Sequence, residues 1–179
     1  MILTGPEITA AAHDGRLTID PFEPEQVNPN SYNVRLGPTL LTYTDTVIDA
    51  HRPNPTREVT IGENGYVLQP GELYLGHTVE QVGSDSFVPL LFGRSSVGRL
   101  GLFVEITAPI GDIGFHGQWT LMLSPIRPLR VYAGMRIGQI MFFVSTGAIA
   151  LYQGKYQAAI GAQPSAYWRD VARLKAVAS

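Results

Sequence analysis

Short apolar stretches separated by glycine and proline constrain the fold of this chain more than any other feature. Stretches such as 87–92 (FVPLLF) and 140–144 (IMFFV) have the length of strands, and turn signals such as 69–71 (QPG) divide them. Nineteen glycines and thirteen prolines are spread along 179 residues without a repeat period. This pattern predicts one all-β domain over residues 1–179, built as a sandwich or a barrel.

Two segments are predicted to be helical. Residues 4–7 (TGPE) match a capping box with an early proline, and the helix that follows is expected to end at Asp14 and Gly15. Residues 166–178 (AYWRDVARLKAVA) can form a second helix close to the C-terminus. The fold class is therefore all-β with minor helices.

Charge and cysteine content exclude several classes of function. Thirteen basic and fifteen acidic residues give a formal net charge of −2, so no nucleic-acid partner is expected and any anion site must be local. The chain has no signal-peptide pattern, and no apolar run approaches the roughly 18 residues of a membrane span. The absence of cysteine is compatible with a reducing compartment. We expect a cytoplasmic protein without a membrane partner.

A metal held by the protein is also not expected. The chain has no cysteine, which removes thiolate sites and the pattern of zinc deaminases. Its four histidines show no spacing typical of metal ligands. The prediction is therefore a protein without zinc.

Residues 111–125 (GDIGFHGQWTLMLSP) predict a strand that leaves a tight turn. From residue 115 onward the odd positions form an apolar face, and most even positions are polar, as a half-buried strand requires. Met122 breaks this alternation because it is an apolar residue on the polar face. It either packs against a partner or stands where polar chemistry is expected.

The densest polar motif is 93–99 (GRSSVGR), between two apolar runs. Two guanidinium groups, two hydroxyls and flexible glycine backbone can surround a phosphate. The motif lacks the pattern of a nucleotide-binding loop that ends in Gly-Lys-Ser/Thr. From the residues alone, a phosphate site and an ordinary polar turn are both open.

Asp112 lies in a glycine-rich loop, 107–114 (TAPIGDIG). Its carboxylate could activate water or accept a ligand hydroxyl, and it could equally cap the backbone of its own turn. Lys155 lies between tyrosines in 152–157 (YQGKYQ) and could close over an anionic ligand or belong to a solvated tail. For both residues, the sequence alone leaves a functional and a structural role open.

Taken in order, these segments resemble the dCTP deaminase family, within the dUTPase-like superfamily. The resemblance covers nearly the whole chain and rests on residues 1–5 (MILTG), 26–37 (QVNPNSYNVRLG), 93–103 (GRSSVGRLGLF), 111–117 (GDIGFHG), 154–157 (GKYQ) and 163–165 (QPS). It implies a distorted, jelly-roll-like β-barrel of the dUTPase type. It also implies a homotrimer with nucleotide sites at the subunit interfaces, Mg²⁺ carried by the triphosphate, and a tail, about 152–179, that closes over the site.

The resemblance also assigns roles to individual residues. Asp112, Ser95 and Arg99 match catalytic positions: Asp112 holds the sugar hydroxyl or activates water, and Arg99 supports the reacting end of the nucleotide. The positions implied to bind the nucleotide are Arg94, Ser95, Ser96, Arg99, Thr107, Ala108, Asp112, Thr120, Tyr152 and Lys155. The expected ligand is a pyrimidine nucleoside triphosphate.

Met122 departs from the family pattern. The resemblance places at this position a glutamate that moves protons during ring deamination, and a thioether cannot exchange a proton in that way. Residues 158–160 (AAI) are likewise apolar where the family has polar residues, and Phe92 precedes the GRSS motif. Several positions expected to face the ligand are therefore apolar.

Three functions follow as hypotheses. The main one is hydrolysis of the phosphate chain by water that Asp112 activates. The first alternative is deamination of dCTP with another acid, for which Glu105 is the candidate. The second alternative is a trimeric nucleotide-binding or regulatory protein without catalysis.

Overall fold

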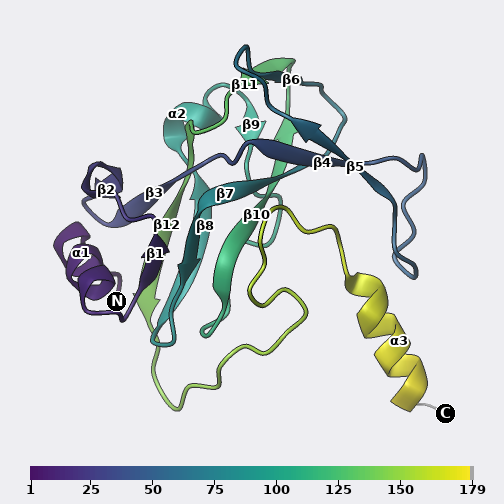
Figure 1. Ribbon diagram of the computed structural model, residues 1–179. Helices are drawn as coiled ribbons and strands as arrows, with labels where there is room; N and C mark the ends of the chain where they lie inside the picture. The colour runs from purple at the N-terminus through teal and green to yellow at the C-terminus, as the bar shows by residue number, and fades with distance from the viewer. Residues whose placement is uncertain (178–179) are drawn as a thin grey trace.

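The computed structural model describes residues 1–177, and most of its elements are strands (Figure 1). The strands are β1 (Thr18–Asp20), β2 (Val27–Asn28), β3 (Ser31–Arg35), β4 (Thr39–Tyr43), β5 (Thr56–Thr60), β6 (Tyr66–Leu68), β7 (Tyr74–Gly83), β8 (Phe87–Gly93), β9 (Leu102–Phe103), β10 (His116–Pro125), β11 (Leu129–Val131) and β12 (Arg136–Val144). The helices are α1 (Gly5–His13), the short 3-10 helix η1 (Pro24–Gln26), α2 (Ser95–Gly98) and α3 (Tyr167–Val177). The predicted all-β class with minor helices is confirmed.

Two larger antiparallel sheets and one strand pair form the body of the molecule. The first sheet has the order β5-β4-β7-β10-β9, with β1 also paired to β7. The second has the order β2-β3-β12-β8, and β11 pairs with β6. Leu121, Leu123, Ile140 and Phe142, from the central strands β10 and β12, are fully buried in one core. Burial of each such side chain contributes roughly 1.5–3 kcal/mol, which fixes β10 firmly in the body.

The predicted alternation of β10 is confirmed. Its odd positions from Gly117 to Leu123 are buried, whereas the even positions from His116 to Ser124 are half-buried. The register with β7 shifts between Gln118 and Thr120, and Met122 then lies opposite Leu75. One face of β10 therefore packs into the core and the other carries Met122 toward the surface.

The predicted capping box at residues 4–7 is wrong in its side-chain contacts. Helix α1 does have Thr4 as its N-cap and a proline in its first turn, but the Thr4 side chain makes no capping bond. Glu7 instead forms an ion pair with Arg16 at 2.8 Å. A charged donor is a stronger partner for a carboxylate than a backbone N–H, so Glu7 is drawn away from the helix end.

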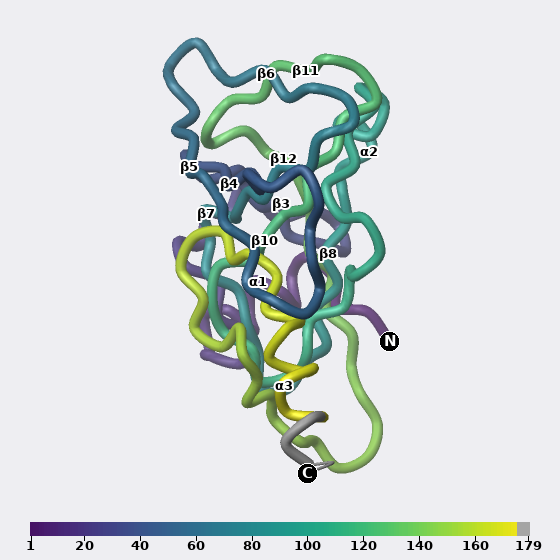
Figure 2. The backbone as a smooth tube through the Cα atoms, turned by 90° about the vertical axis from the view of Figure 1, so that its right-hand side faces the viewer, coloured from purple at the N-terminus to yellow at the C-terminus, as the bar shows by residue number. Residues whose placement is uncertain are grey.

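The chain beyond β12 returns along β10 before it enters α3 (Figures 1 and 2). Helix α3 extends away from the sheets and corresponds to the predicted helix 166–178, of which Ala178 lies outside the described residues. Within residues 1–177, no helix combines the length and the apolar character needed to cross a bilayer.

Tyr32 in β3 is a buried tyrosine whose hydroxyl is held by the backbone. The residue is 0% exposed, and its hydroxyl accepts the N–H of Glu23 at 2.8 Å. Burial is the main cause that raises the pKa of Tyr32 to about 12. The phenol of the unfolded chain ionises near pH 10. The contribution of Tyr32 to the free energy of unfolding is therefore complete below about pH 10 and is lost as the pH rises toward about 12.

The variant Tyr32→Phe is expected to lower the free energy of unfolding by about 1 kcal/mol near pH 7, because the Glu23 N–H loses its acceptor. This deficit should shrink at about pH 11, where the unaltered chain pays for keeping its phenol neutral. Urea unfolding at both pH values measures the difference. Tyr132→Phe, at a tyrosine that is 47% exposed, is the matched control. A deficit of the same size at both pH values contradicts the assignment.

Candidate functional site

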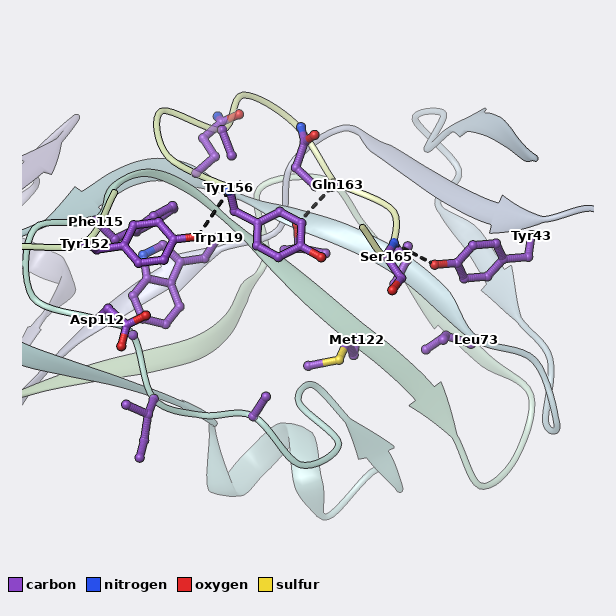
Figure 3. Close-up of a pocket in the computed structure, with 17 residues that line it drawn as sticks. Tyr43, Leu73, Asp112, Phe115, Trp119, Met122, Tyr152, Tyr156, Gln163 and Ser165 are labelled. Atoms are coloured by element: carbon purple, nitrogen blue, oxygen red, sulfur yellow. Dashed lines mark hydrogen bonds between the residues drawn. The ribbon is translucent and has the colours of Figure 1, made fainter. Parts of the chain in front are cut away.

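A cavity of about 460 Å³ lies between the half-buried face of β10, the loop that precedes β10 and the C-terminal tail (Figure 3). Aromatic and aliphatic side chains form most of its walls. Asp112 and Trp119 lie toward one end of the view, and Met122, Leu73 and Tyr43 lie toward the other. The cavity therefore has an end with a carboxylate and an end that is mainly apolar.

Three successive even positions of β10 line this cavity: Gln118, Thr120 and Met122. The Thr120 hydroxyl accepts the N–H of Gln163 at 2.9 Å, and the Gln118 side-chain oxygen accepts the N–H of Gly161 at 2.6 Å. Met122 has no polar side-chain atom apart from its sulfur, a weak acceptor. Within one chain Met122 faces the cavity. This placement favours the second interpretation of the sequence, in which Met122 stands where polar chemistry is expected.

Asp112 is exposed at the opposite end of the cavity, on a loop fixed by backbone contacts. Gly111 donates its N–H to the Pro89 carbonyl at 2.8 Å, and Phe115 donates its N–H to the Asp112 carbonyl at 3.2 Å. Within the described part of the chain, the Asp112 carboxylate accepts no hydrogen bond. The carboxylate is therefore available to water or to a ligand, and the backbone contacts alone form the turn.

An aromatic cluster forms the wall next to Asp112. Phe115 packs edge-to-face on Trp119 with ring centroids 5.9 Å apart, and on Tyr152 at 6.1 Å. The indole N–H of Trp119 donates to the Val82 carbonyl at 3.2 Å, which fixes the ring. The rings are steeply inclined to one another, so together they form an apolar wall of the cavity.

The predicted phosphate-binding motif lies elsewhere. It forms α2, anchored by the buried side chain of Val97, and leaves Ser95, Ser96 and Arg99 exposed and Arg94 half-buried. None of these four polar residues lines the cavity. Within the described part of a single chain, these four residues therefore do not share a cavity with Asp112.

The loop before Asp112 divides the residues predicted there. Ala108 lines the cavity, whereas Thr107 is exposed outside it. Glu105, the candidate acid for deamination, does not line the cavity, and its carboxylate accepts the N–H of Ala108. That contact holds the Glu105 side chain to its own loop.

Of the two predicted tail residues, only one lines the cavity. Tyr152 lines the cavity, and Lys155 does not. The Lys155 ammonium group forms an ion pair with the Asp170 carboxylate of α3. Lys155 is therefore engaged with the tail in this structure.

The sequence interpretation missed two tyrosines that line the cavity. Tyr43 ends β4, and Tyr156 belongs to the GKYQ segment of the tail. Of the two, only Tyr156 lies in a segment, 152–157, for which the sequence predicts a function. Tyr43 reaches the site because Ser165, 122 positions away, donates its N–H to the Tyr43 hydroxyl at 2.9 Å.

Across the described residues, no group of three or more His, Cys, Asp or Glu side chains could hold a metal ion. Asp112 is the only acidic residue that lines the cavity in this part of the chain. A divalent ion at this site would therefore arrive mainly on the ligand's phosphates.

Comparison with known proteins identifies the family. A family model described as dCTP deaminase-like matches residues 2–145. The chain belongs to the dCTP deaminase-like family. Asp112, Met122 and α2 fall inside the matched span of the dCTP deaminase-like domain, whereas Tyr152 and Lys155 follow it.

Relatives of this family cover nearly the whole chain. A protein of Leptospira biflexa named "dCTP deaminase, dUMP-forming" is 48% identical over 171 residues, which are 95% of this chain and 98% of the relative. A protein of Clostridium acetobutylicum with the same name is 45% identical over the same shares of both chains. The crystal structure of 2'-deoxycytidine 5'-triphosphate deaminase from Agrobacterium tumefaciens matches with a TM-score of 0.65 and 24% identity, over 80% of this chain and 48% of that chain. This likeness supports the same fold.

Proposed function

We propose that this chain binds a pyrimidine deoxynucleoside triphosphate together with Mg²⁺ and hydrolyses its phosphate chain. One observation carries the proposal: Asp112 is the acidic residue that lines the cavity, and Met122 stands where a deaminating acid is expected. Forming dUMP from dCTP, as the relatives' name describes, needs both loss of the amino group and removal of two phosphates. The residues in this cavity suit the second change.

In the hydrolysis step Asp112 is the proton acceptor. The carboxylate takes a proton from a water molecule whose oxygen forms a bond to the α-phosphorus. The bond from the α-phosphorus to the bridging oxygen breaks, and pyrophosphate leaves. Mg²⁺ carried by the substrate's phosphates would supply neutralising charge for this step.

We infer that the phosphate-binding residues reach the cavity from a neighbouring subunit of a homotrimer. Arg94, Ser95, Ser96 and Arg99 do not line the cavity of their own chain. Close to α2, the apolar side chains of Leu100, Phe103 and Ile126 are more than half exposed. An exposed apolar patch of this kind is typical of a surface that packs against another subunit.

A mixing experiment tests the shared site. Arg99→Ala and Asp112→Asn are each expected to lower pyrophosphate release by about 10²-fold or more. Refolding the two variants together should restore about a quarter of the unaltered activity, because in a cyclic trimer about one site in four receives Asp112 from one variant and Arg99 from the other. Refolding each variant alone is the control. No recovery in the mixture contradicts a site shared between subunits.

Nucleotide binding is testable without turnover. A ligand at about 100 times its Kd adds about 2.7 kcal/mol to the free energy of unfolding, which for a chain of this length corresponds to about 5–10 °C in Tm. We expect this shift for a pyrimidine deoxynucleoside triphosphate with Mg²⁺, and a smaller one without Mg²⁺. Thermal unfolding monitored against a nucleotide panel measures it. No shift with any nucleotide contradicts the proposed function.

A second candidate function is deamination of dCTP, which the names of the relatives favour. It requires an acid at the base. Glu105 is engaged with the Ala108 N–H outside the cavity lining, so it would have to move. Nucleotide binding without any turnover is the third outcome that the same assays distinguish.

A further inference from the structure

Two tyrosine hydroxyls mark the apolar end of the cavity. The Tyr43 hydroxyl accepts the N–H of Ser165 and the Tyr156 hydroxyl accepts the N–H of Ala166, both at 2.9 Å. Figure 3 shows both hydroxyls directed toward the part of the cavity where Met122 lies. In the described chain neither hydroxyl donates to a protein acceptor. A phenol that accepts one N–H still has its own proton, so both groups are set to donate to a ligand.

Acceptors are scarce at this end. Met122, Leu73 and Leu75 supply the neighbouring walls. The hydroxyls of Thr120 and Ser165 also line the cavity, and each already accepts a backbone N–H, from Gln163 and from Tyr167. The free carboxylate of Asp112 lies at the opposite end. A ligand group buried next to Met122 therefore meets hydrogen-bond donors and apolar surface.

The base is the part of a nucleotide that suits this end. A triphosphate would need cationic partners, and no Lys or Arg lines the cavity within the described residues. A flat, uncharged pyrimidine fits among Met122, Leu73 and the tyrosine rings. Its exocyclic group would then face the part of the cavity that Tyr43 and Tyr156 line.

We propose that the site selects a pyrimidine with a carbonyl at C4, as in uracil, over one with an amino group, as in cytosine. A carbonyl accepts the tyrosine O–H, whereas an amino group places N–H donors against O–H donors and the Met122 thioether. A buried donor without a partner weakens binding by about tenfold or more. The selection rests on the proposed nucleotide binding and adds a preference that relatives named for dCTP do not suggest.

Calorimetric titration with the α,β-imido analogues of dUTP and dCTP, both with Mg²⁺, tests the selection. The uracil analogue is expected to bind about tenfold more tightly or better. Equal affinities, or tighter binding of the cytosine analogue, overturn the selection and leave the proposed function standing. If neither analogue binds, both the selection and the proposed function fail.

Variants test whether the hydroxyls of Tyr43 and Tyr156 cause the preference for uracil. Tyr43→Phe and Tyr156→Phe each remove one donor, and each should lower the ratio of uracil to cytosine affinity. Loss of the acceptor for the Ser165 or Ala166 N–H loosens the tail for both ligands, so the ratio is the informative quantity. Met122→Gln supplies an acceptor and should strengthen cytosine binding.

Tyr132→Phe is the control for these variants. Tyr132 is 47% exposed and does not line the cavity. The affinity ratio should not change in this variant. A ratio that stays constant in Tyr43→Phe and Tyr156→Phe as well overturns the assignment to their hydroxyls.

Discussion

Asp112→Asn lowers pyrophosphate release by about 10²- to 10⁴-fold, the range typical for loss of a general base. Asparagine keeps the size of the side chain and one acceptor oxygen, but its amide cannot take a proton from water. Binding of the nucleotide should change by only a few fold, because Asp112 has no structural contact through its carboxylate in the described chain. Pyrophosphate release and calorimetric binding, measured on the same preparation, separate the two effects.

Asp85→Asn is the control for this variant. Asp85 is an exposed carboxylate paired with His116 at 2.9 Å, outside the residues that line the cavity. Its substitution removes one negative charge at a comparable surface position and should leave pyrophosphate release unchanged. Full activity in Asp112→Asn would remove Asp112 from its assigned role.

Met122→Glu gives the chain the ability to release ammonia from dCTP. The new carboxylate would enter the cavity from the half-buried face of β10, opposite Leu75. Apolar neighbours raise the pKa of such a carboxyl group, which suits an acid that both gives and takes protons. The expected rate is about 10²-fold or more above the background measured with the unaltered chain, the lower range for general acid–base catalysis.

Met122→Gln separates proton transfer from shape. Glutamine has nearly the same size and supplies hydrogen bonds, but it cannot transfer a proton as a carboxyl group does. It should bind dCTP without ammonia release. If Met122→Glu binds dCTP and also releases no ammonia, the acid belongs at another position and Met122 does not account for the proposed loss of deamination.

The parts of the fold that depend on local pattern could be predicted from the sequence. The alternation of apolar and polar residues predicted the buried and half-buried faces of β10, because successive side chains on a strand point to opposite sides. The departure at Met122 was visible for the same reason. The capping box failed because Arg16, nine residues from Glu7, competes for its carboxylate.

The cavity itself depends on contacts that no short segment contains. Tyr43 and Ser165 are 122 positions apart, and Thr120 meets Gln163 across 43 positions. Neither pair carries a local pattern that predicts it. No local pattern predicts that α2 lies apart from Asp112, although the family resemblance implies sites at subunit interfaces. The structure shows that residues 94–99 lie outside the cavity of their own chain.

The most direct measurement of the central claim follows ammonia and pyrophosphate together in reactions of the unaltered chain with dCTP and with dUTP, each with Mg²⁺. A cavity with Asp112 at one end and Met122 at the other predicts pyrophosphate release from dUTP and no ammonia from dCTP. Ammonia released from dCTP by the unaltered chain, at a rate comparable to pyrophosphate, would contradict it.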